Sequence, residues 1–207
     1  MNNHDIKIRS FTGGMAQTNG YLLGSSKNDS GCVLIDAPLG ISKWLDSLNE
    51  KPSSLLLTHQ HYDHIEDVAK LAEKGMEIYA YAPYSKNLTL EILLKQSGIP
   101  IDINPYKVDQ ILNGQSELIT GGFNFKLEHV PGHSPDSIVF IYDNLVFGGD
   151  TLFAGGIGRA DLPDGDMDLL IQGIQEKMLT LQPAARVFPG HGPDTTIAAE
   201  SASNPFL

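Results

Sequence analysis

The sequence predicts a layered α/β fold, because strand-like and helix-like segments alternate along its 207 residues. Short apolar runs bounded by glycine and proline are typical of buried strands. The runs that fit this pattern are Ile6–Phe11, Gly20–Leu23, Cys32–Ile35, Ser54–Leu57, Glu77–Tyr81, Phe123–Val130, Ser137–Tyr142, Leu145–Phe147 and Arg186–Phe188. The segments with helical character are Ser42–Leu48, Ile65–Lys74, Tyr84–Gln96, Met167–Leu179 and Asp194–Ser201. We therefore expect two sheets between layers of helices.

The segment Ile65–Lys74 shows the helical pattern clearly. Its apolar residues Ile65, Val68 and Ala72 recur at helical spacing, which gives the segment one face to bury. Glu66 lies in the first turn, where the helix dipole favours negative charge. No Ser/Gly tract, charge block or low-complexity run divides the chain, so we predict a single domain over residues 1–207.

Composition excludes some classes of function. The net charge of −11 argues against a nucleic-acid surface, which needs clustered lysine and arginine. Cys32 is the only cysteine, so no intramolecular disulfide forms, and its apolar neighbours favour a core position. Met1–Phe11 has no apolar signal core, and no stretch approaches membrane-spanning length. We expect a cytoplasmic protein with neither membrane nor nucleic-acid partners.

Histidines and aspartates follow several of the predicted strands at the point where each strand ends. These residues are His59, His61, Asp63 and His64 after Ser54–Leu57, His133 after Phe123–Val130, Asp150 after Leu145–Phe147, and His191 after Arg186–Phe188. Loops at one sheet edge converge and carry chemistry, and imidazole with carboxylate suits zinc, iron or manganese. A single buried histidine is usually a hydrogen-bonded core residue. Burying the whole set without a metal would leave several titratable groups uncompensated. The set therefore predicts a metal site.

Spacing within the heptapeptide 58–64 would allow one short segment to supply ligands to two adjacent metals. In an extended chain His59, His61 and Asp63 project to the same side, because side chains alternate with period two. His64 points elsewhere as the backbone turns into the following helix. A local repeat, Pro-Gly-His at 131–133 and again at 189–191, delivers two more histidines at turns that glycine permits.

These motifs, in this order, resemble the metallo-β-lactamase-fold hydrolases, and among them most closely the short type II glyoxalases (hydroxyacylglutathione hydrolases). The stretches Gly149–Phe153, Gly158–Asp161 and Pro189–Pro193 carry the closer similarity. The resemblance implies an αββα metallo-β-lactamase-like sandwich of two mixed β-sheets flanked by helices. It also implies a ligand set: His59, His61 and His133 for a first metal, Asp63, His64 and His191 for a second, and Asp150 as the bridge.

The resemblance further implies a binuclear metallohydrolase that uses a hydroxide bridging two divalent ions. We expect zinc first, with iron or manganese as alternatives, and catalytic roles for Asp63 and Asp150. The sequence has no Gly-x-Ser-x-Gly elbow to supply a serine nucleophile. A small-molecule acyl thioester suits such a site, because a thiol with a pKa of about 8.5 leaves as thiolate without a dedicated general acid.

Arg159 is the predicted substrate-binding residue. By resemblance it occupies the place of a basic residue that contacts glutathione; the alternative is a local salt bridge to Asp161 or Asp164. The chain ends at Leu207, without the helical domain that completes the glutathione site in longer enzymes. Glutathione is therefore disfavoured, and coenzyme A, bacillithiol or a phosphopantetheine arm remain open as thiol carriers.

Other functions of the same fold also remain open. A persulfide dioxygenase would bind one iron through two histidines and a carboxylate. A coenzyme A or acyl-carrier thioesterase, or a lactonase in a specialised pathway, is a further alternative. A non-catalytic binding module is disfavoured, because no ligand of the set is missing. The acyl group, the metal and the oligomeric state cannot be assigned from the sequence.

Overall fold

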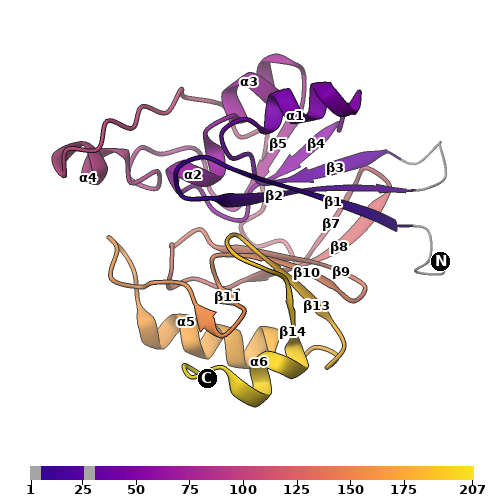
Figure 1. The fold of residues 1–207 in the computed structure, drawn as a ribbon, viewed down its shortest axis with the longest axis vertical. Coiled ribbons are helices and arrows are strands. Elements are labelled where there is room, and N and C mark those ends of the chain that lie inside the picture. The colour runs from indigo at the N-terminus through magenta and orange to yellow at the C-terminus, as the bar shows by residue number, and fades with distance from the viewer. Residues whose placement is uncertain (1–5, 26–30) are drawn as a thin grey trace.

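Two six-stranded sheets lie face to face, as a computed structural model of residues 6–25 and 31–207 shows (Figure 1). The first sheet has the order β1-β2-β3-β4-β5-β6 and the second β14-β13-β10-β9-β8-β7. The first comprises β1 (Ile6–Gly13), β2 (Thr18–Ser25), β3 (Cys32–Ile35), β4 (Ser54–Leu56), β5 (Glu77–Ala80) and β6 (Gln110–Ile111). The second comprises β7 (Glu117–Thr120), β8 (Phe123–His129), β9 (Ile138–Tyr142), β10 (Leu145–Gly149), β13 (Arg186–Pro189) and β14 (Thr195–Thr196).

Both sheets are mixed. In the first, β1, β2 and β3 pair antiparallel, and β3 through β6 pair parallel. In the second, only β10 and β13 run parallel to each other. A small hairpin of β11 (Leu152–Phe153) and β12 (Gly156–Ile157) follows β10. Parallel pairs bring the carboxyl ends of their strands to one edge, which is where the predicted ligands follow.

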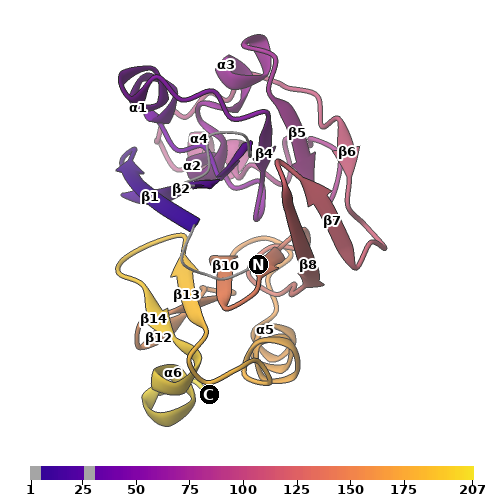
Figure 2. The ribbon, with the colours of Figure 1, turned by 90° about the vertical axis from the view of Figure 1, so that its right-hand side faces the viewer.

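Helices cover the outer faces of the sheets. Figure 2 shows α1 and α3 at one end of the molecule and α5 and α6 at the other. The helices are α1 (Ile41–Leu48), α2 (Tyr62–Ile65), α3 (Val68–Glu73), α4 (Glu91–Gln96), α5 (Met167–Gly173) and α6 (Ile197–Ser203). A π-helical turn, Ile174–Met178, continues α5. No helix in the described ranges is long and apolar enough to cross a lipid bilayer.

Side-chain alternation along the central strands produces the layers. Leu34 and Leu55 face the helices of the first sheet, whereas Ile35 and Leu56 face the second sheet. Phe125 and Phe140, both fully buried, reach the same central layer from the second sheet. A third cluster packs the other face of the second sheet against α5 and α6. The αββα sandwich predicted from the sequence is therefore what the chain forms.

Three predicted helices differ from the observed ones. The helix predicted at Ile65–Lys74 is two short helices, α2 and α3, because Asp67 between them has non-helical backbone angles and accepts backbone N–H groups from the α1 turn. The helix predicted at Tyr84–Gln96 begins only at Glu91, since Leu90 before it has a φ of 60°. The helix predicted at Asp194–Ser201 begins at Ile197, after residues that form β14.

The short strands β6, β7, β11, β12 and β14 were not predicted, because runs of two to four residues carry too little periodicity. The first part of the N-terminal segment, residues 1–5, and residues 26–30 lie outside the described ranges.

Candidate metal centre

The structure brings the predicted ligand residues together from the turn of α2 and the residues before it and from the segments that follow β8, β10 and β13. Their donor atoms form sets in which all atoms lie within 4.8 Å of one another. The sets are His59, His61 and His133; His59, His64 and Asp150; and Asp63, His64 and His191. The first and third sets match the two metal sites that the resemblance implies. The second set contains Asp150 and shares one histidine with each of the other two sets.

The heptapeptide reaches the site through a change in backbone conformation. His61 is extended, with φ −61° and ψ 147°, and it caps the single turn of α2 that carries Asp63 and His64. The His64 N–H donates to the His61 carbonyl at 3.0 Å, which closes this turn. His59 and His61 therefore precede the turn, whereas His64 lies within it and points differently, as the spacing predicts.

Glycines let the strand ends come close together. A Cβ on Gly190 would lie 2.1 Å from Asp150 Oδ1, and a Cβ on Gly149 would lie 2.3 Å from Thr58 Oγ1. Gly149 also has a φ of 53°, a conformation that side chains rarely adopt. These glycines allow the β10 and β13 ends to place Asp150 and His191 side by side.

Each of four histidines has its Nδ1 within hydrogen-bonding distance of an oxygen outside the cluster. His64 Nδ1 lies 2.8 Å from Asp36 Oδ2, and His133 Nδ1 lies 2.7 Å from the Arg159 carbonyl. His191 Nδ1 contacts the Ala16 carbonyl at 3.2 Å, and His59 Nδ1 contacts Thr58 Oγ1 at 3.2 Å. A carbonyl only accepts, so Nδ1 donates in His133 and His191, and Nε2 of each ring faces the cluster.

Buried side-chain atoms that lack a hydrogen-bond partner show whether a metal fits this site. His59 Nε2, His64 Nε2, His133 Nε2 and Asp150 Oδ1 are buried without a hydrogen-bond partner. Buried polar atoms are normally hydrogen-bonded, so a group of them at one point indicates a missing partner. Lone pairs of imidazole and carboxylate are ligands for zinc, iron and manganese. The residues present therefore fit a pair of divalent ions.

Asp150 lies between the histidines of both predicted sites. Its Oδ2 is 3.5 Å from His133 Nε2 and 3.3 Å from His191 Nε2, and its Oδ1 is 3.3 Å from His64 Nε2. Asp63 Oδ2 is 3.3 Å from His191 Nε2 and accepts a 2.6 Å hydrogen bond from Thr18 Oγ1. Asp150 therefore lies within 3.5 Å of histidines from both sets, whereas Asp63 lies near the histidines of one set.

Burial keeps the imidazoles of the first set neutral. Desolvation lowers the pKa of His59 well below its usual value and the pKa of His61 to about 3, with neighbouring histidines adding to the effect. Desolvation also lowers the pKa of His133. A neutral imidazole is the form that binds a metal, so these histidines need lose no proton before ligation.

The second set has the opposite electrostatics. Burial works against charge on His64, but Asp63, Asp150 and Asp36 outweigh it and raise the pKa of His64 well above its usual value. Hydrogen bonds to Asp150 and Asp63 similarly outweigh burial and raise the pKa of His191 to about 10. Burial raises the pKa of Asp63, yet His64 and His191 bring it down to about 2. Protonated His64 and His191 therefore supply the positive charge beside Asp63 and Asp150 that a metal cation would supply when bound.

The structure places the Arg159 side chain in a salt bridge rather than at the cluster. Its Nε and Nη2 donate to the Asp161 carboxylate at 2.7 and 2.8 Å, and the side chain is 63% exposed. Only its backbone carbonyl contacts a ligand residue, His133. The salt-bridge partner of Arg159 is therefore Asp161 rather than Asp164.

Several supporting residues were not identified from the sequence. Asp36 accepts hydrogen bonds from Thr58 N and Thr58 Oγ1 and contacts His64, and it does so with a φ of 56°. Thr18 supports Asp63. The only sequence signal for Asp36 is an acidic residue directly after an apolar strand.

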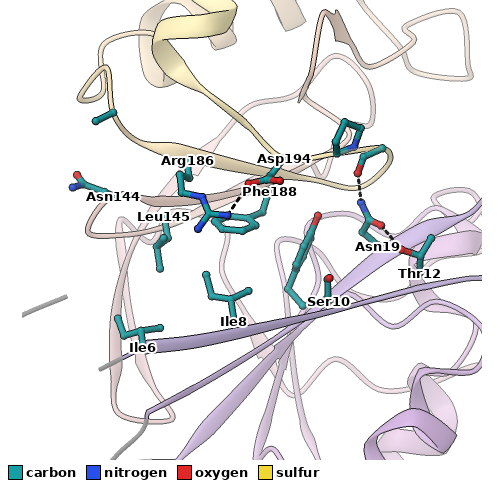
Figure 3. A pocket seen from close by; sticks show the side chains of 14 residues that line it. Ile6, Ile8, Ser10, Thr12, Asn19, Asn144, Leu145, Arg186, Phe188 and Asp194 are labelled. Atoms are coloured by element: carbon teal, nitrogen blue, oxygen red, sulfur yellow. Dashed lines mark hydrogen bonds and ion pairs between the residues drawn. The ribbon is translucent and has the colours of Figure 1, made fainter. Parts of the chain in front are cut away.

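A cavity beside the turn that carries His191 is lined by none of the candidate ligands. It has a volume of about 650 Å³, and Figure 3 shows Ile6 and Ile8 of β1 facing Arg186 and Phe188 of β13 across it. Asn19, at its rim, donates to the Pro189 and Gly192 carbonyls and so supports the turn that presents His191. Cavity size alone does not locate the chemistry here, whereas the converging lone pairs do.

Comparison with known proteins identifies the family. The model of the metallo-beta-lactamase superfamily matches residues 13–191. The chain belongs to this superfamily. It is 36% identical to the probable metallo-hydrolase YqgX of Bacillus subtilis over 98% of both chains. It is 40% identical to the hydroxyacylglutathione hydrolase GloC of Haemophilus influenzae over 79% of both chains.

Solved structures of the metallo-beta-lactamase fold agree with the architecture. The BLEG-1 B3 metallo-beta-lactamase superposes with a TM-score of 0.88 at 33% identity, covering 97% of this chain and 99% of that one. TTHA1623 in a di-iron-bound form superposes with a TM-score of 0.80 at 33% identity, covering 96% and 100%. These likenesses confirm the predicted fold and cover almost the whole chain.

Proposed function

We propose that this metallo-beta-lactamase superfamily member is a metallo-hydrolase that cleaves small-molecule acyl thioesters. The observation that carries the proposal is a group of buried atoms without a hydrogen-bond partner: the Nε2 atoms of His59, His64 and His133 and the Oδ1 of Asp150. A thioester hydrolase of this kind needs two cations and no protein nucleophile, and the cluster offers donor atoms for both. The relationship to GloC supports the thioester as substrate.

Two sets of residues would hold the ions. His59, His61 and His133 form one set and Asp63, His64 and His191 the other, with Asp150 between them. We propose zinc in both sites, with iron or manganese as alternatives, and the di-iron form of TTHA1623 supports iron as one of these. When bound, two such ions lower the pKa of a water between them and polarise the substrate carbonyl.

The reaction adds water across the C–S bond of the thioester. The water oxygen bonds to the carbonyl carbon, the C–S electron pair leaves with sulfur, and the products are a carboxylate, a thiol and a proton. The carboxylate of Asp150 contributes negative charge between the two sets of histidines, 3.3–3.5 Å from three of them. Asp63, whose pKa is about 2, stays ionised, which favours its role as a ligand over that of a proton store.

The leaving group explains why a thioester is favoured over an amide. A thiol leaves as thiolate near neutral pH, whereas an amine needs a proton. The histidines of the cluster have their Nδ1 protons committed to Asp36, Thr58, Arg159 and Ala16 oxygens. Cys32, whose Sγ lies 3.9 Å from Glu50, is not part of the cluster and is no candidate nucleophile.

A test of this proposal measures thiol release from acyl thioesters on several carriers. The protein is stripped of metal, reloaded with zinc, iron or manganese, and assayed with thioesters of glutathione, coenzyme A and a short pantetheine mimic. We expect thiol release that requires metal and is lost in His59→Ala and His64→Ala. Parallel assays follow oxygen uptake with a persulfide and hydrolysis of a β-lactam. Activity on either, with no thiol release from any thioester, would overturn the proposal.

A further inference from the structure

A groove of about 280 Å³ lies between the segment that includes α4 (residues 86–96), which we call the α4 arm, and the loop that precedes α5 (residues 158–166). Figure 1 shows both segments reaching out on the same side of the molecule, the side on which α2 lies. The apolar residues that line the groove are Leu90, Ile92, Leu93 and Pro163, and polar residues such as Lys86 and Asp164 complete its walls.

Both walls of the groove are attached to segments that carry candidate ligands. On one wall, the Thr89 carbonyl accepts a 3.0 Å hydrogen bond from the N–H of Tyr62, which lies between His61 and Asp63. On the other wall, the loop is bonded at both ends to the turn that carries His133. His133 Nδ1 donates to the Arg159 carbonyl at 2.7 Å, and the Asp166 N–H donates to the Gly132 carbonyl at 2.8 Å.

The groove therefore opens beside the first set of ligands. The two attached segments meet at His61 and His133, whose rings are 4.5 Å apart between centroids. The groove is thus an apolar surface joined by these backbone contacts to the segments that carry His61 and His133. Bound ions are not needed for this placement, since it follows from backbone hydrogen bonds alone.

The groove has features typical of a binding surface. Leu90 and Asp164, one on each wall, have φ values of 60° and 61°, which non-glycine residues rarely adopt. Such strained positions cluster at ligand clamps and active sites. Ile92 and Leu93 leave 47% and 36% of their surface exposed to water. Side chains that are apolar, exposed and in contact with a cavity gain free energy when an apolar ligand covers them.

We propose that this groove binds the apolar acyl chain of the thioester, an inference that rests on the proposed function. The charges favour the acyl chain over an anionic thiol carrier. The Lys86 ammonium lies 3.7 Å from the Glu91 carboxylate, Asp164 adds negative charge, and the nearby Arg159 is paired with Asp161. The net charge of −11 also opposes an anion. An uncharged acyl chain would meet no electrostatic repulsion in the groove.

The volume sets the length of chain that fits. About 280 Å³ holds roughly nine groups of the size of a water molecule, at ~30 Å³ each. A methylene group is of similar size, so the groove accommodates a chain of about eight carbons. Each buried methylene contributes about 0.8 kcal/mol, which corresponds to up to about fourfold in kcat/KM. Partial exposure in an open groove reduces this to about two- to fourfold.

The experiment uses thioesters of one neutral carrier, N-acetylcysteamine, with acetyl, butyryl, hexanoyl, octanoyl and dodecanoyl chains. For the metal-loaded wild type we expect kcat/KM to rise about two- to fourfold per methylene up to about eight carbons and then to level off. A series without dependence on chain length, with hydrolysis intact, would overturn the inference and leave the proposed function standing.

A substitution locates the effect in the groove. Leu93→Glu introduces a charge at an exposed helical position that glutamate tolerates. It should flatten the series, so that kcat/KM no longer rises from the acetyl to the octanoyl thioester. The matched control is Ile119→Glu, at a 75% exposed apolar residue on β7 outside the groove, which should leave the series unchanged. Equal behaviour of the two variants would refute the assignment.

A binding measurement separates this inference from the proposed function. The octyl thioether of N-acetylcysteamine has no scissile carbonyl, and calorimetry reports its binding without turnover. We expect binding to the wild type and to Ile119→Glu, and at least tenfold weaker binding to Leu93→Glu. If no thioester is hydrolysed, the proposed function fails while this titration still decides the groove. Equal affinity in all three proteins would overturn the inference.

Discussion

Replacing Asp36 by asparagine should weaken metal binding without removing any ligand. Asp36 is buried, and its two oxygens accept from Thr58 N at 2.8 Å and Thr58 Oγ1 at 2.7 Å and contact His64 Nδ1 at 2.8 Å. Asparagine keeps the shape and tolerates the φ of 56° at this position. In either orientation of its amide, however, the NH₂ group faces an N–H donor, either Thr58 N or His64 Nδ1.

The size of the effect follows from that clash. A buried donor without an acceptor costs about 1–3 kcal/mol, so the free energy of unfolding should fall by this amount. His64 then loses the acceptor that fixes its Nδ1 proton and so orients its Nε2 toward the predicted metal site. Loss of such a supporting group typically reduces metal affinity about 10- to 100-fold. The loss should be confined to the ion held by the set that contains Asp63, His64 and His191.

Competition titration with a chromophoric chelator, combined with elemental analysis, measures the affinity of each site. The matched control is Asp67→Asn, at a buried aspartate that accepts backbone N–H groups from Gly40 and Ser42 but has no place in the ligand sets. This control should lose a similar amount of stability and no metal affinity. Two ions bound by Asp36→Asn as tightly as by the wild type would refute the reasoning.

Three further outcomes are expected. Asp150→Asn should keep the fold and lower thioester hydrolysis by about a hundredfold or more, because it removes the charge between the two sets; turnover near the wild-type rate would assign it a purely structural role. Arg159→Ala should change kcat/KM less than about threefold and stability by less than about 1 kcal/mol, since its guanidinium is exposed and paired; a tenfold rise in KM with an anionic carrier would instead establish a contact with substrate. Metal loading near pH 7 should release about two protons in a pH-stat, because the raised pKa values of His64 and His191 keep both protonated without metal. Affinity should therefore rise with pH toward the pKa of His191 at about 10, and binding without proton release would contradict this.

The layered fold and the ligand cluster could be predicted from the sequence because each leaves a local pattern. Strand ends such as Ser54–Leu57 before His59 combine an apolar run with a turn and a polar residue, and the observed β4 ends at Leu56. The parallel pair β10 and β13 then brings the Asp150 and His191 ends together. The heptapeptide follows β4 of the other sheet and reaches them through the face-to-face packing of the two sheets, which the sequence pattern does not encode locally.

Contacts that join distant segments left no local pattern. The helix expected from Tyr84 fails because the Thr89 carbonyl bonds to Tyr62 N and Leu90 adopts a positive φ, so α4 begins later. The first of these features joins segments more than twenty residues apart. Asp36 was missed for the same reason, since its importance lies in reaching Thr58 and His64 across two strands.

We propose that this chain holds two metal ions and uses them to hydrolyse thioesters. The most direct test titrates metal into the metal-free wild type and records bound metal per chain together with thiol release from an octanoyl thioester. We expect activity that appears as the ratio approaches two ions per chain and disappears on chelation. A protein that saturates at one ion, releases no thiol, and takes up oxygen when given a persulfide would contradict it.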